Sequence, residues 1–237
     1  MNIRSIAKII ADISENTEDD VYNLLKDENY INELIKKYWF ITDDIKNNNI
    51  YYPLEGYLYP ETYQFMKDAT VKDIFKTMLD EMDKKLTKFK SNIEESSYSV
   101  HQLLTLASIV ELEAGNSHER GKVAGVFYNR LNAGWTLGSD VTTYYAAKKT
   151  FKEDLTYDEL NACNSYYTRG TCLKGLPVGP ICNPGIESIE GVVNPVTSEY
   201  YYFVADKNGK TYFNTDAYGH QTTIAELKNN NLWYIYE

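Results

Sequence analysis

Two glutamates near the end of an apolar helix are the side chains of this sequence best suited to chemistry. Residues 103–114, LLTLASIVELEA, place their apolar side chains on one broad arc of a helix, and Glu111 and Glu113 fall on the two borders of that arc. A carboxyl group beside an apolar surface is costly to ionise, so its pKa should rise, as a general acid requires. More commonly, a glutamate at such a border reaches solvent or an arginine. Helix geometry alone does not choose between the two.

Four other blocks flank this helix in a fixed order. LEGYLYPETYQF (54–65) precedes it, and VAGVFYNRLNAGWTLGSDVTTYYA (123–146), GLPVGPICNPG (175–185) and YYYFVADKNGKTYFNTDAYGH (200–220) follow it. With these blocks the chain resembles the YceG-like family, the endolytic murein transglycosylases, from about residue 3 to its end. Several separated motifs in one order are more specific than a single short pattern. The family pattern places the catalytic glutamate first in the pair, which implies Glu111.

The resemblance implies cleavage of the bond between MurNAc and GlcNAc in peptidoglycan glycan strands by a single carboxyl group. Glu111 would protonate the glycosidic oxygen and then accept the proton of the MurNAc 6-hydroxyl, which closes a 1,6-anhydro ring on its own C1. This reaction consumes no water and needs no metal or cofactor. A hydrolytic muramidase on the same fold would need a second carboxylate, for which Asp140, Glu55 and Glu113 are the candidates.

The resemblance also implies a set of substrate-binding residues. They are Asp140, Thr142 and Tyr145 in and after the DVT turn, Asn164 and Tyr166 in CNSY, Asn183 in the PICNPG loop, and His220 after FNT. Structural roles are open for several of them: an Asx turn for Asp140, a loop hydrogen bond for Asn164 and a buried hydrogen bond for His220. We expect the site in a groove walled by the helix of Glu111, the turn at 138–145 and the loop at 163–185.

Charge and hydropathy restrict the partners and the compartment. The formal net charge of −10 over 237 residues speaks against nucleic-acid binding. The most apolar window is too short to cross a bilayer. Because the family usually carries an N-terminal membrane helix and a LysM-like segment, we expect the chain to be the outer part of a single-pass membrane protein, with Met1 as an added start residue; a naturally shorter soluble protein is the alternative. Cell-wall synthases are candidate partners.

Three cysteines lie within twenty residues of one another, and their odd number leaves at least one unpaired. We favour a Cys163–Cys172 disulfide, which would persist outside the cytoplasm, with Cys182 free. Three free thiols are the alternative. Zinc ligation is disfavoured because the spacings fit no finger pattern and the stretch has no histidine.

Periodicity predicts an α+β fold in two parts. Residues 1–50 form a helical N-terminal segment, and residues 51–237 form a catalytic domain of helices with a small antiparallel sheet. An apolar stripe predicts a helix over 70–90, and further helices are expected at 99–113, 119–131, 186–193 and 222–229. The Asn-Gly pair at 208–209 predicts a hairpin of strands 200–205 and 210–214.

Two other functions stay open from the sequence. A non-catalytic peptidoglycan-binding or scaffold module would keep the fold without the reaction. A cysteine hydrolase would use one of the three thiols with His220, but none of the cysteines begins an evident helix.

Overall fold

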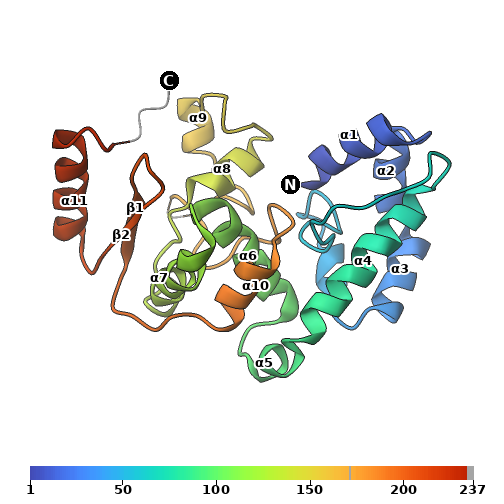
Figure 1. Ribbon diagram of the computed structural model, residues 1–237, viewed down its shortest axis with the longest axis horizontal. Helices are drawn as coiled ribbons and strands as arrows, with labels where there is room; N and C mark the ends of the chain where they lie inside the picture. Colours follow the sequence, from blue (N-terminus) through green and yellow to red (C-terminus); the bar gives the residue numbers. More distant parts are fainter. Residues whose placement is uncertain (171, 234–237) are drawn as a thin grey trace.

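The computed structural model describes residues 1–170 and 172–233 of the chain (Figure 1). In that part the backbone forms eleven α-helices, two 3₁₀ helices and one two-stranded antiparallel sheet, which confirms the predicted α+β class. The helices are α1 (Ile3–Ile13), α2 (Glu18–Leu25), α3 (Glu28–Lys37), α4 (Val71–Thr87), α5 (Lys90–Glu95), α6 (Val100–Glu113), α7 (Arg120–Asn132), α8 (Asp140–Ala146), α9 (Tyr157–Leu160), α10 (Ile186–Val193) and α11 (Ala217–Asn229). The 3₁₀ helices are η1 (Asp43–Lys46) and η2 (Ser117–Glu119), and the strands are β1 (Tyr202–Ala205) and β2 (Thr211–Asn214).

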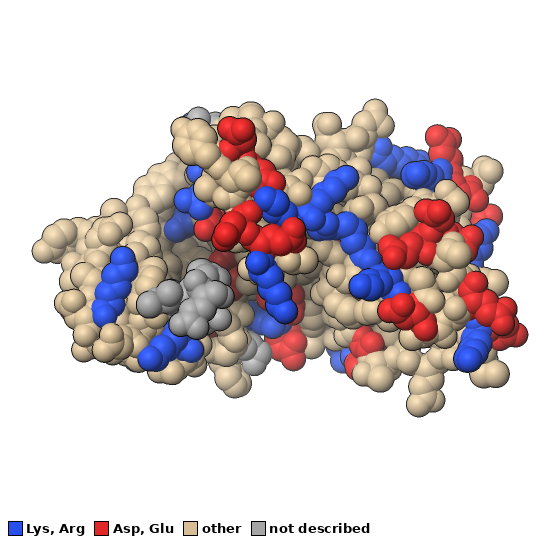
Figure 2. Space-filling view, turned by 90° about the horizontal axis from the view of Figure 1, so that it is seen from above, with Lys and Arg blue, Asp and Glu red and all other residues tan. Residues whose placement is uncertain are grey.

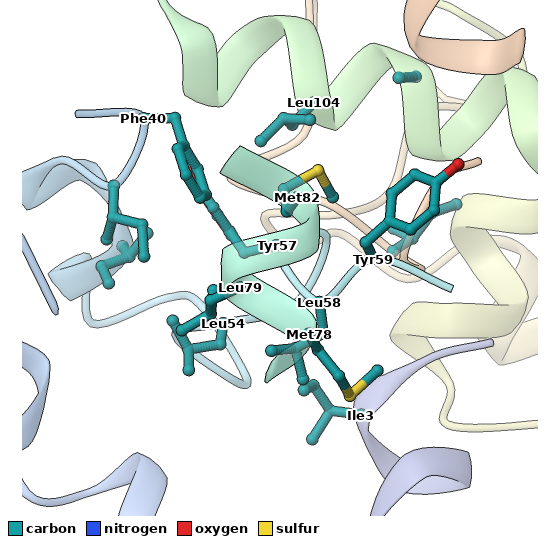
Figure 3. Close-up of a cluster of buried hydrophobic side chains, with 14 of the residues drawn as sticks. Ile3, Phe40, Leu54, Tyr57, Leu58, Tyr59, Met78, Leu79, Met82 and Leu104 are labelled. Carbon is teal, nitrogen blue, oxygen red and sulfur yellow. The ribbon is translucent and has the colours of Figure 1, made fainter. Parts of the chain in front are cut away.

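A helical layer of α1 to α4 occupies one end of the molecule, on the right of Figure 1. Thr17 and Thr70 begin α2 and α4 with capping boxes, in which Asp20 and Asp73 bind back to the cap backbone. The apolar stripe predicted for α4 is buried along its whole length. Figure 3 shows Met78, Leu79 and Met82 of α4 beside side chains from the segment that follows α3. Within that segment, the ring of Tyr57 stacks on the ring of Phe40, with centroids 6.3 Å apart.

Helix α6 lies at the centre of the fold. Ser99 and Gln102 form the capping box that starts it, and from residue 100 to residue 110 every side chain except Gln102 is buried. A helix that is apolar on all sides needs neighbours on all sides, and α6 packs against α7, α8 and α10. Helix α10 lies close to α7 because Gly191 has no side chain: a Cβ there would come within 2.9 Å of the Gly121 nitrogen.

The hairpin and α11 form the other end of the molecule, on the left of Figure 1. The strands pair antiparallel, with Phe203 opposite Phe213. The turn between them contains the predicted Asn-Gly pair. The ring of Phe127 on α7 meets the ring of Phe203 edge-on, with centroids 5.7 Å apart, and so attaches the hairpin to the centre. Helix α11 begins five residues earlier than predicted, at Ala217, because Asp216 caps it by accepting the Gly219 N–H.

The long loop after α9 is held by a disulfide and by buried polar contacts. Cys163 and Cys172 are bonded, with their Cα atoms 5.8 Å apart, and Cys182 is a free buried thiol that donates to the Ser108 carbonyl, which confirms the favoured pairing. Asn183 accepts the Leu58 N–H and its backbone N–H donates to the Met1 carbonyl. The boundary at residue 50 stays a prediction. Of the helices within residues 1–170 and 172–233, none combines the length and hydropathy that crossing a membrane requires.

Candidate active site

The first glutamate of the pair, Glu111, is the centre of an ion-pair and hydrogen-bond cluster. Its Oε2 accepts from Arg120 Nη1 at 2.7 Å, from the Ser188 hydroxyl at 2.6 Å and from the Gly185 N–H at 3.0 Å, while Oε1 accepts from Arg120 Nη2 at 3.3 Å. The side chains of Glu111 and Arg120 are only 23% and 15% exposed. This carboxylate therefore joins α6 to the starts of α7 and α10 through charge-assisted hydrogen bonds.

The second glutamate, Glu113, has very different surroundings. It is the last residue of α6 and half-buried, and one of its oxygens, Oε1, accepts from the Ser139 hydroxyl at 2.6 Å. Burial raises the pKa of Glu113 and the negative charge of Asp140 adds to this rise, while the Ser139 hydroxyl and Arg130 act against it. The negative end of the helix dipole is also unfavourable to an anion at this position. No ion pair within residues 1–170 and 172–233 includes Glu113.

Glu113 lines a groove of about 730 Å³ between α6, α8 and the hairpin. Gly138 opens the α8 side: its φ of +64° turns the chain so that Ser139 reaches Glu113 and Asp140 begins α8. The groove is lined by Leu112, Glu113, Gly115, Phe127, Arg130, Gly138, Asp140, Val141, Tyr144, Phe151, Phe203, Val204, Ala205, Asp206, Lys207, Gly209, His220 and Trp233. Acidic, basic and aromatic side chains therefore meet in a hollow large enough for a small ligand.

Two of the implied substrate-binding residues lie in this groove with Glu113. Asp140 is exposed and paired with Arg169 at 2.7 Å. His220 stacks on Tyr202 with centroids 5.3 Å apart, and its buried Nδ1 has no partner among the described residues. Burial, together with the charge of Arg130, lowers the pKa of His220, so it is a neutral hydrogen-bonding group near neutral pH.

The other five implied residues are mostly held in internal contacts. Thr142 donates to the Ser139 carbonyl, Asn164 accepts from the backbone N–H groups of Tyr166 and Tyr167, and the Tyr166 hydroxyl accepts the Tyr51 N–H. These contacts match the structural alternative for Asn164.

The remaining two residues meet at a buried carboxyl group. Glu55 accepts from the Tyr145 hydroxyl at 3.1 Å, from Asn183 Nδ2 at 3.3 Å and from the Ile3 N–H at 3.1 Å. It is 1% exposed, and burial raises its pKa to about 7. The sequence also allowed an ion pair of Glu55 with Arg120 or Arg130, but the described contacts of Glu55 include neither arginine. Tyr145 also reaches a second hollow next to the groove.

The wall of the groove opposite α8 is not formed by the loop that we expected there. The hairpin β1–β2 forms it, whereas residues 163–185, which we expected there, contribute no lining residue to this groove. That loop is instead stapled by its disulfide and packed against α6 through Ile181 and Cys182. The turn expected at 138–145 is mostly the short helix α8.

Sequence reasoning missed Ser139, Tyr144, Phe151 and Trp233 as site residues. Only Ser139 gave a signal, as a hydroxyl next to Asp140. From the sequence we expect Arg130 in an internal salt bridge or bound to the backbone rather than as a substrate clamp, and it donates to the backbone carbonyls of Leu137 and Tyr201. In the described part of the chain, no three His, Cys, Asp or Glu side chains gather as a metal site would need.

A concave groove with apolar and aromatic walls, a few polar groups and a carboxyl group of raised pKa has the features of a ligand-binding or catalytic site. Residues 1–226 match the model of the YceG-like family, and the chain belongs to that family.

Known relatives agree with this assignment. The chain is 39% identical over 213 residues to the endolytic murein transglycosylase of Bacillus subtilis (strain 168), a match that covers 89% of this chain and 58% of that protein. It is 33% identical over 238 residues to the endolytic murein transglycosylase of Streptococcus pneumoniae serotype 2 (strain D39), covering 97% and 43%. The chain thus spans about half the length of these curated relatives. A crystal structure of a yceG-like protein from Listeria monocytogenes matches with a TM-score of 0.87 and 36% identity, covering 94% of this chain and 73% of that one.

Proposed function

We propose that this chain is the catalytic part of an endolytic murein transglycosylase, and that Glu113, rather than Glu111, is its general acid and base. The observation that carries the assignment is the contrast between the two carboxyl groups. Glu111 is bound by an arginine, a hydroxyl and a backbone N–H, and it lines neither the groove nor the hollow beside it. Glu113 faces the groove with a raised pKa.

A protonated Glu113 can deliver its proton to the glycosidic oxygen of a strand lying in the groove, which breaks the bond to C1 of MurNAc. The resulting carboxylate then takes the proton of the MurNAc 6-hydroxyl as that oxygen bonds to C1, so the enzyme returns to its starting state and the product is a 1,6-anhydro ring. Ser139 holds one oxygen of the carboxyl group and leaves the other free for the transfer. The intramolecular attack gains from proximity.

A single carboxyl group suffices for this reaction, and the contacts of the other acids support such an assignment. Asp140 is paired with Arg169, and Asp206 accepts from the backbone N–H groups of Asn208 and Lys210 in the hairpin turn. A hydrolase would need one of them to hold water or to attack C1.

The expected substrate is a peptidoglycan glycan strand, and the enzyme would act on the outer face of the cell membrane. The walls fit sugar rings: Tyr144, Phe151 and Trp233 present apolar faces, while Arg130 and His220 supply polar groups. Cell-wall synthases are the partners we would test, since cleavage of nascent strands would act on their product.

Digestion of purified peptidoglycan in ¹⁸O-labelled water, followed by mass spectrometry, tests the proposal. We expect 1,6-anhydro-MurNAc ends that carry no label and lie one water below reducing ends. The Glu113→Gln variant, prepared in parallel, identifies any product that comes from a contaminating enzyme. Labelled reducing ends as the main product would show a muramidase, with Asp140 as the first partner to test. No cleavage by a folded parent chain that still binds the strands would indicate a binding module.

A further inference from the structure

A second hollow of about 440 Å³ adjoins the groove at Glu113. The two hollows are neighbours because Leu112, Val141, Tyr144 and Phe151 line both of them. The rings of Tyr144 and Phe151 meet edge-on with centroids 5.2 Å apart at the junction, and Phe151 is 50% exposed. A chain-like ligand bound at Glu113 could therefore extend over the rings of Tyr144 and Phe151 toward α1.

The second hollow has an apolar floor and a basic rim. Ile181 and Cys182 contribute to the floor, and Arg4, Lys8 and Lys149 contribute the cations. No aspartate or glutamate is present among the described residues that line it. In a chain of net charge −10, a lining with three cations and no acid is unusual. Figure 2, which looks onto the side where α8 and α9 lie, shows Lys and Arg side chains across the middle of this face, with Asp and Glu side chains beside them.

Two of the three cations have donors available to a ligand. Arg4 donates from Nη1 to the Lys148 carbonyl at 2.5 Å, which fixes the guanidinium and leaves most of its five N–H groups for other acceptors. Lys8 lies one helical turn further along α1, is exposed, and takes part in no ion pair within residues 1–170 and 172–233. Lys149 is already paired with Glu159 at 2.6 Å, so it contributes less.

We propose that this second hollow is a subsite for an acidic peptide attached to the glycan, and that Arg4 and Lys8 bind its carboxylates. The inference rests on the proposed function, because peptidoglycan carries such peptides on its muramyl residues. A strand seated at Glu113 would lay a neighbouring sugar on Tyr144 and Phe151 and place that sugar's peptide stem between α1 and α8. Recognition of the stem is then separate from the chemistry at Glu113.

The test compares two forms of the same glycan strands, one with its peptide stems and one from which an amidase has removed them. For the Arg4→Gln/Lys8→Gln variant we expect kcat/KM to fall about tenfold on strands with stems, mainly through KM, and to stay unchanged on strands without stems. The parent should prefer strands with stems by a similar factor, and this preference should weaken as salt is raised. Equal loss on both substrates, or no loss on either, overturns the proposal.

A matched control keeps the charge change the same. Lys26→Gln/Lys36→Gln removes two exposed cations from the helical layer without touching either hollow, so it should leave the preference intact. Lys8→Gln alone should give part of the effect with an unchanged melting temperature, since Lys8 makes no ion pair in the described part of the chain.

Binding separates this proposal from the proposed function. The Glu113→Gln variant should bind a muramyl peptide several-fold more tightly than the same sugar without its peptide, and the added Arg4 and Lys8 changes should abolish that difference. If the parent cleaves no strand but this binding difference is present, the reaction assignment fails and the subsite stands. If the parent cleaves and the binding difference is absent, the subsite fails alone.

Discussion

The two sides of helix α6 hold the same carboxyl group in opposite surroundings. On the side of α7 and α10, Glu111 accepts hydrogen bonds from Arg120, Ser188 and the Gly185 backbone. On the side of α8, Glu113 accepts from a single hydroxyl, that of Ser139, and faces the groove. A fully bonded carboxylate stabilises the native structure, whereas an under-bonded one has a raised pKa and is free to move a proton. Under the proposed function, α6 is a structural element on one side and a reactive element on the other.

The largest expected effect separates the two glutamates by activity. Glu113→Gln should lower cleavage of purified peptidoglycan by about 10²–10⁴-fold, because the amide keeps the shape but cannot deliver a proton. Glu111→Gln should reduce cleavage by less than about tenfold when both variants are assayed well below their melting temperatures. Product release measured by chromatography is the readout. The opposite order of activities would return the catalytic role to Glu111, as the family pattern implied.

The next effect separates them by stability. Glu111→Gln should lower the free energy of unfolding by about 2–3 kcal/mol, since it leaves the partly buried guanidinium of Arg120 with only the exposed carboxylate of Glu187, 3.9 Å away, as an anionic partner. For a chain of this size that corresponds to a melting temperature about 5–10 °C lower. Lys46→Gln, which breaks an exposed pair with Asp43, is the matched control and should cost less than about 1 kcal/mol.

A double-mutant cycle isolates the pair itself. Adding Arg120→Met to Glu111→Gln removes the unpaired charge, so the combined loss of stability should be smaller than the sum of the two single losses. Strict additivity would mean that Glu111 stabilises the fold without help from Arg120.

The sequence predicted several of the elements but not this contrast. Local signals placed α4, α10 and the hairpin closely, because capping residues, apolar stripes and the Asn-Gly turn act over a few neighbouring residues. Which glutamate meets Arg120 depends on how α7 and α10 pack on α6, and that contact joins residues up to 77 positions apart. Periodicity carries no information about such distant partners.

The site walls were harder still to predict. Residues 163–185 had the composition of a functional loop, yet their polar groups serve the disulfide-stapled turn and the bonds to Ser108 and Met1. The hairpin looked like an ordinary strand pair, and its place in the groove follows from the packing of Phe203 on Phe127. Composition indicated which segments were irregular, but not which of them faced Glu113.

A smaller effect tests the charge balance around Glu113 through the pH profile of cleavage. Asp140 raises the pKa of Glu113 and Ser139 lowers it. Catalysis needs the protonated acid, so activity should decline as pH rises through this pKa. Asp140→Asn should therefore move the alkaline limb of the kcat/KM profile to lower pH, and Ser139→Ala should move it to higher pH. Shifts in the same direction, or none, would show that this limb reports another group.

The smallest effect is a dependence of stability on pH that belongs to Glu113 alone. Its pKa is raised in the folded protein, so native Glu113 binds its proton more tightly than the unfolded chain does. The resulting stabilisation is fully present below the unfolded pKa, near 4.5, and is lost as pH rises through the raised folded pKa. A glutamine stays neutral and avoids that loss. Melting curves should therefore show that the stability of Glu113→Gln relative to the parent improves from pH 4 to pH 8. A stability difference that does not change with pH would mean that the native fold stabilises the Glu113 anion as well as water does, and the reason to assign the proton transfer to Glu113 would be lost.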